Sequence, residues 1–173
     1  MIDLVKGLPL LAVLAVGQIT IVNPLELIDG PPDLLLVALV ALALLRGPVV
    51  GAIGGFWTGI IVDVATLDTL GLTSLLLVLV GYGIGRFGDV TTVRSAQLPR
   101  VLLAVLIATI GLMAGSILIN FMLGTSVPLG PVLVRSFLPT LALNLVLAYP
   151  VFLLLRLLFR VHVRQRPEVV SAG

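Results

Sequence analysis

Long apolar stretches recur along the whole chain, and they limit how it can fold more than any other feature. A helix of about 20 apolar residues spans the hydrocarbon core of a bilayer. Of the 173 residues, 60% are hydrophobic and only 10% are charged, whereas soluble domains carry about 25% charged residues. Such a chain cannot cover itself with a wettable surface. We therefore predict an integral membrane protein with almost no water-soluble part.

The apolar stretches predict six membrane spans, at approximately residues 8–22, 33–45, 48–64, 70–85, 100–123 and 132–159. Helices are expected because lipid cannot satisfy an open backbone, and because the alternation typical of membrane strands is missing. The second and third spans are short for a crossing, which leaves open a tight hairpin or shallow helices in a thinned bilayer. The predicted fold class is an all-α, polytopic membrane helical bundle. It forms one transmembrane domain over residues 1–160, followed by a basic and polar cytoplasmic tail over 161–173.

The basic residues predict the orientation, because Lys and Arg are enriched in cytoplasmic loops. If both termini are cytoplasmic, nine of the ten basic residues fall inside, namely Lys6, Arg46, Arg86, Arg94, Arg100, Arg156, Arg160, Arg164 and Arg166. Only Arg135 falls at the outer end. Five of the eight acidic residues fall outside, namely Glu26, Asp29, Asp33, Asp63 and Asp68. We expect a multi-pass protein with both termini in the cytoplasm.

The third predicted span carries a glycine at every fourth position, namely Gly47, Gly51, Gly55 and Gly59. Residues four apart lie on nearly the same face of a helix, so another backbone can approach this stripe closely. Packing within the bundle is the first interpretation. Docking of a helix from a partner protein is the alternative.

Three charged residues, Asp33, Asp63 and Arg135, map to the outer ends of their predicted spans. Charges near the hydrocarbon are costly and tend to be paired. We therefore consider an ion pair of Arg135 with Asp63 or Asp33. The alternative is that all three side chains simply reach the lipid headgroups.

Three uncharged polar residues, Gln18, Asn120 and Asn144, interrupt apolar runs. We expect each to form a hydrogen bond with a neighbouring helix, which is the common use of such residues in membranes. Trp57 lies in the middle of its span rather than at an interface, so we expect it to be buried by packing.

The sequence offers no chemistry for catalysis. Cysteine is absent, which excludes disulfides and thiolate metal sites. The single histidine, His162, lies in the basic tail, so no nucleophile and base can be combined. We expect no enzymatic activity, no cofactor and no metal. Nucleic acid is not an expected partner, because the net charge is only +2 and the basic residues lie at the ends of apolar spans.

Six short motifs occur in an order that is more specific than any one of them. They are Pro-Asp-Leu-Leu-Leu at 32–36, Ala-Leu-Leu-Arg-Gly-Pro at 43–48, Gly-Ala-Ile-Gly-Gly-Phe-Trp-Thr-Gly-Ile-Ile-Val-Asp at 51–63, Leu-Gly-Leu at 70–72, Val-Gly-Tyr at 80–82 and Phe-Leu-Pro-Thr-Leu-Ala-Leu-Asn-Leu-Val-Leu-Ala-Tyr-Pro at 137–150. This order resembles the MreD family of rod shape-determining proteins over roughly residues 30–160.

The resemblance implies a non-enzymatic scaffold of the cell-elongation machinery in the bacterial cytoplasmic (inner) membrane. Members of the family act with an MreC-like protein. Through it they act with MreB filaments, the glycosyltransferase RodA and the elongation penicillin-binding protein in peptidoglycan synthesis. In this interpretation the Gly51, Gly55 and Gly59 face is the first candidate for docking the partner's membrane helix. Membrane lipids are the other expected partner, at the basic tail.

The family fold is also similar to the substrate-binding subunits of energy-coupling-factor vitamin transporters, which gives an alternative function. The segment 47–55 looks like the third-span signature of those subunits. Two features favour the scaffold. Ala12 and Ala15 are three residues apart, where those subunits present small residues four apart. The loop 124–131 has only Thr125 and Ser126 as hydrogen-bonding side chains, which is poor for binding a vitamin.

Overall fold

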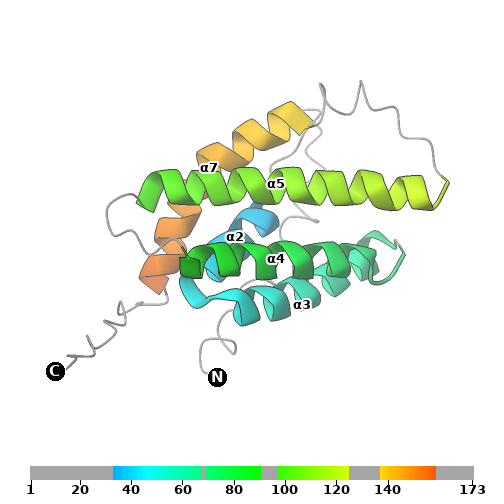
Figure 1. The fold of residues 1–173 in the computed structure, drawn as a ribbon, viewed down its shortest axis with the longest axis horizontal. Coiled ribbons are helices and arrows are strands. Elements are labelled where there is room, and N and C mark those ends of the chain that lie inside the picture. The colour runs from blue at the N-terminus through cyan, green and yellow to red at the C-terminus, as the bar shows by residue number, and fades with distance from the viewer. Residues whose placement is uncertain (1–32, 68, 91–96, 125–136, 159–173) are drawn as a thin grey trace, which may run out of the picture.

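Every regular element in the described part of the chain is an α-helix (Figure 1). The structure is a computed structural model and describes residues 33–67, 69–90, 97–124 and 137–158. The helices are α2 (Leu34–Arg46), α3 (Pro48–Thr66), α4 (Leu72–Val90), α5 (Gln97–Met122) and α7 (Leu138–Leu158). The predicted all-α bundle is confirmed for these ranges. The predicted span over 8–22 and the tail over 161–173 lie outside the described residues.

Three of the described helices are long and apolar enough to cross a membrane. They are Pro48–Thr66, Leu98–Met122 and Leu138–Leu157, whereas Leu34–Arg46 and Leu72–Gly88 are shorter apolar helices. The number of six spans is therefore not confirmed: the described ranges contain three helices of spanning length and two shorter apolar helices.

The ends of α2 and α3 follow from local chemistry. Asp33 precedes α2 and its side chain accepts a hydrogen bond from the backbone N–H of Leu36 at 2.9 Å, which caps the first turn. Gly47 ends α2 with a φ of 91°, a left-handed conformation that glycine adopts at little cost. Pro48 then begins α3, where a missing N–H costs nothing. This tight corner makes α2 and α3 antiparallel neighbours.

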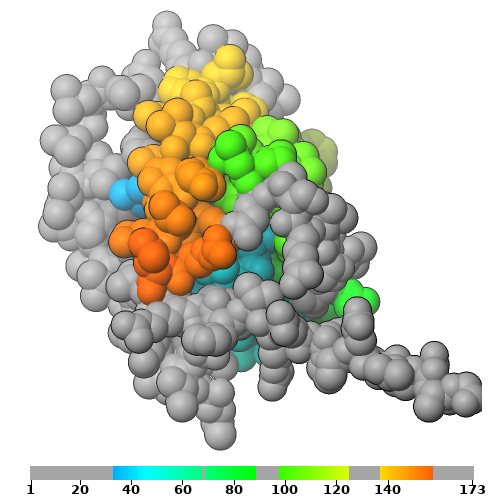
Figure 2. Space-filling model, turned by 90° about the vertical axis from the view of Figure 1, so that its left-hand side faces the viewer, coloured from blue at the N-terminus to red at the C-terminus, as the bar shows by residue number. Residues whose placement is uncertain are grey.

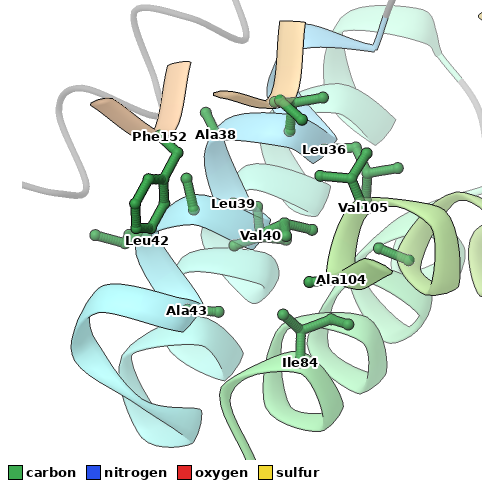
Figure 3. Close-up of a cluster of buried hydrophobic side chains, with 14 of the residues drawn as sticks. Leu36, Ala38, Leu39, Val40, Leu42, Ala43, Ile84, Ala104, Val105 and Phe152 are labelled. Atoms are coloured by element: carbon green, nitrogen blue, oxygen red, sulfur yellow. The ribbon is translucent and has the colours of Figure 1, made fainter. Parts of the chain in front are cut away.

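Helix α2 lies at the centre of the bundle and contacts α3, α4, α5 and α7. All nine residues from Leu35 to Ala43 are buried, with exposed fractions of 4% or less. Figure 3 shows its side chains packed against Val105 and Ala104 of α5 on one side and Phe152 of α7 on another. The tight corner between α2 and α3 fits the hairpin alternative. The other alternative, a shallow helix in lipid, is wrong for α2, because other helices enclose it on every face.

The described arginines gather at one end of the bundle. Arg46 ends α2, Arg86 lies near the end of α4, Arg100 near the start of α5 and Arg156 near the end of α7. The Arg100 guanidinium donates a hydrogen bond to the backbone carbonyl of Gly88, which joins α5 to the end of α4. We call this the arginine end. It corresponds to the predicted cytoplasmic side.

Viewed from this end, α7 (yellow to orange) runs across the molecule beside α5 (green) (Figure 2). Only small parts of the blue and cyan segments, which include the start of α2 and the beginning of α3, remain visible. The view agrees with the burial of α2, because α7 covers one side of it. In the described part of the chain, the core is therefore centred on the short helix α2, and α4, α5 and α7 contribute buried side chains to it.

Candidate functional site

The glycine stripe of α3 packs directly on the backbone of α4. A Cβ atom built on Gly51 would lie less than 3.0 Å from the carbonyl group of Gly81. The same holds for Gly55 against the backbone of Leu77 and for Gly59 against that of Ser74. Real Cβ atoms do not approach so closely, so only glycine fits at these three positions. The result is a seam in which two helix backbones touch.

Helix α4 contributes glycines of its own to this seam. A Cβ atom on Gly81 would meet the carbonyl of Gly51, and one on Gly85 would meet the backbone of Pro48. Gly51, Gly55 and Gly59 are all buried, so their face is already occupied by α4 and is not open to a partner helix. The interpretation as internal packing holds. Gly47 serves differently, because it forms the corner between α2 and α3.

Asp63 lies inside the bundle near the end of α3. Its exposed fraction is 0%, and Oδ2 accepts a hydrogen bond from the backbone N–H of Gly71 at 2.7 Å. This bond fixes the turn between α3 and α4. Its other oxygen, Oδ1, has no hydrogen-bond partner among the described residues. The suggestion that Asp63 reaches the headgroups is wrong, because the side chain is enclosed.

A chain of hydrogen bonds joins α2, α7 and α5. The backbone N–H of Asp33 donates to Oδ1 of Asn144 at 2.8 Å. Nδ2 of Asn144 donates to Oγ1 of Thr109 at 3.4 Å, and Thr109 donates to the carbonyl of Val105 at 2.8 Å. We call Asp33, Asn144 and Thr109 the polar junction. The expectation that Asn144 bonds a neighbouring helix is confirmed.

Thr109 is the member of the polar junction that sequence reasoning missed. Its exposed fraction is 5%, and its hydroxyl bonds the carbonyl four residues earlier, as threonine commonly does in membrane helices. Because this bond is common, the sequence does not distinguish a threonine that also joins two helices from one that does not. The one indirect signal was Asn144, because a buried asparagine needs a hydrogen-bond partner for its amide. Nothing in the sequence showed that Thr109 is this partner.

Of the remaining candidate residues, Asn120 and Trp57 are described, and neither belongs to the polar junction. Asn120 donates to the carbonyl of Ser116 on its own helix at 2.9 Å. Gln18 and Arg135 lie outside the described residues, so the pairing of Arg135 with Asp63 or Asp33 stays a prediction. Trp57 is 51% exposed and packs edge-on against Phe56 with ring centroids 5.9 Å apart. The expectation that Trp57 is buried is wrong, because the tight face of α3 is the glycine face.

The described ranges contain no group of three or more His, Cys, Asp or Glu side chains placed to hold a metal ion. Their buried polar groups instead cap helices, fix a turn and join helices. Together with helices of spanning length, these features are typical of a helical membrane protein.

A family model described as rod shape-determining protein MreD matches residues 2–162. The chain therefore belongs to the MreD family, a family of shape-determining membrane proteins that are not known as enzymes. No curated protein and no solved structure matches the chain.

Proposed function

We propose that this chain is a non-enzymatic scaffold of the bacterial cell-elongation machinery, in the cytoplasmic membrane. It binds the membrane helix of an MreC-like partner, and through that partner it acts with the elongation synthases and MreB filaments. The observation that carries the proposal is the family match over residues 2–162, which covers all five described helices. The interior supports it, since its polar groups are used for assembly of the bundle.

The outer face of α5 is the docking surface we propose, in place of the glycine stripe that α4 covers. Helix α5 has 26 residues and is the longest in the described ranges. Exposed residues follow one face of it along almost its whole length, namely Leu103, Ile107, Ile110, Gly111, Ala114, Leu118 and Phe121. They recur at intervals of three and four residues. A helix lying nearly parallel to α5 would contact all of them.

Two small residues in the middle of this face allow close approach. Gly111 is exposed, and the nearest atom to a Cβ built there is a methyl group of Val80 at 3.9 Å. Ala114 is exposed as well. In lipid, helices associate through van der Waals packing, which small residues favour because they let the backbones come together. Gly111 and Ala114 therefore mark the proposed crossing point.

Affinity purification from native membranes tests the function. The tagged protein is extracted in mild detergent, and the proteins that copurify are identified by mass spectrometry. Recovery of an MreC-like protein with the elongation synthases is the expected result. Recovery of a coupling subunit with paired ATPases would contradict the scaffold and support the vitamin-transporter alternative.

A matched pair of variants tests the surface. Gly111→Leu adds a large side chain to the proposed face of α5. Gly83→Leu adds the same side chain to α4, where a Cβ at Gly83 has nothing within 4 Å. Both variants are expected to fold. Gly111→Leu should reduce recovery of the MreC-like partner about tenfold, a loss of about 1.4 kcal/mol, and Gly83→Leu should not. Equal recovery from both variants would show that the α5 face meets only lipid.

A further inference from the structure

Helix α2 is too short to cross a bilayer. Its 13 residues span about 20 Å at 1.5 Å per residue, whereas the hydrocarbon core is about 30 Å thick. Its last residue, Arg46, lies at the arginine end. Its first turn therefore lies inside the bundle, well short of the opposite end.

The polar junction shows how deep that first turn lies. Thr109 is nine residues from Arg100 along α5, and Asn144 is twelve residues from Arg156 along α7. Measured along the helix axes, these separations are about 14 Å and 18 Å, which are upper limits on the depth below the arginine end. Asp33, bonded to Asn144, is thirteen residues or about 20 Å from Arg46. Half of the hydrocarbon thickness is about 15 Å. The length along α5 therefore places Thr109 near the bilayer centre, and Asn144 and Asp33 lie at a similar depth because hydrogen bonds join them to it.

We propose that α2 is a half-membrane helix that starts near the bilayer centre and runs only to the arginine end. Irregular backbone at that depth is tolerated only where protein or water satisfies it. The polar junction meets this need, since Asn144 accepts the N–H of Asp33 and the Asp33 side chain accepts the N–H of Leu36. Enclosure of Leu35 to Ala43 by other helices keeps the rest of α2 out of lipid.

The start of α4 provides a matched comparison for the start of α2. Leu34 and Leu72 are each the first residue of a helix, and each is partly buried. They differ in depth, because Leu72 follows the turn that joins α3 to α4 at the end opposite the arginines. The protein has no cysteine, so a single introduced thiol reports on one position alone.

The experiment compares Leu34→Cys with Leu72→Cys in the full-length protein in lipid nanodiscs. A charged, membrane-impermeant thiol reagent reaches both faces of a nanodisc, so the orientation of the protein does not matter. Leu72→Cys should react at least about tenfold faster than Leu34→Cys, and both should react equally after unfolding in dodecyl sulfate. Equal rates in nanodiscs would overturn the proposal, because they would place Leu34 at the membrane surface or in contact with water.

The unsubstituted protein gives a second measurement that needs no variant. Hydrogen–deuterium exchange in nanodiscs should be slow in the first turn of α2 and fast in the first turn of α4. If the two first turns exchange equally fast, α2 begins in water and the proposal fails.

Discussion

Two joints in this bundle hold helices together by different means. Along the seam of α3 and α4, glycines bring the two backbones into contact, with Gly51 against Gly81 as the pair in which both residues are glycine. Where α5 and α7 meet α2, the contact is made by side chains, and Asn144 links Asp33 to Thr109. The seam depends on shape and tolerates no added atom. The junction depends on donors and acceptors, so it tolerates a change of size better than a loss of polarity.

The largest effect is expected from placing a side chain in the seam. Gly55→Leu would force α3 and α4 apart, because even a Cβ atom there meets the backbone of Leu77. Overpacking of this kind typically costs about 1–3 kcal/mol, and in some cases more. We expect loss of monodisperse protein on gel filtration, or a large drop in the unfolding temperature in detergent. Gly83→Leu on the open side of α4 is the control. Equal stability of the two variants would contradict the seam.

A smaller effect is expected from removing the polarity of the junction. Asn144→Leu leaves the N–H of Asp33 without its acceptor, and a buried unsatisfied group costs about 1–3 kcal/mol. Asn120→Leu is the control, since Asn120 is only partly buried and lies outside the polar junction. Unfolding of both variants in detergent gives the comparison. If Asn144→Leu is no less stable than Asn120→Leu, packing alone joins α7 to α2.

The seam has a polar contact of its own at Asp63, and a double-mutant cycle sharpens its role. If Arg135 pairs with Asp63, Asp63→Ala and Arg135→Ala should be non-additive by about 1 kcal/mol in the free energy of unfolding. The pairing would supply a donor for Oδ1, which lacks one among the described residues. Strictly additive losses would show that the two side chains are not coupled.

The smallest effect is expected on the face of α3 turned away from the seam. Trp57 is 51% exposed, so Trp57→Ala should change the free energy of unfolding in detergent by about 0.5 kcal/mol or less. Gly55 and Trp57 are two residues apart on one helix, which makes them a direct test of sidedness. A loss for Trp57→Ala as large as that for Gly55→Leu would contradict it.

Much of the fold was open to prediction from the sequence. The predicted spans 33–45 and 48–64 agree closely with α2 and α3, because Asp33, Gly47 and Pro48 mark helix ends by well-understood chemistry. The glycine spacing predicted a close approach of two backbones. Which helix fills the stripe was harder to see, although Gly81 and Gly85 repeat the same spacing on α4.

The enclosure of α2 could not be read from its composition. Residues 34–45 are uniformly apolar, and such a segment looks the same whether lipid or protein surrounds it. Its length of 13 residues was the available signal, and thinning of the bilayer explained that length equally well. The polar junction was hidden for a related reason, since a hydrogen bond from α7 to α2 spans 111 positions in sequence.

The central place of α2 also bears on how the protein is made. The α3–α4 seam joins neighbours in the chain, so it can form as soon as both helices leave the ribosome. Helix α2 must instead wait for α7, whose last residue is synthesised 112 positions after Arg46. At about 5–20 residues per second, that interval is roughly 6–22 seconds. During synthesis the apolar segment that becomes the core is sheltered by lipid or by the insertion machinery, and the last helix completes its enclosure.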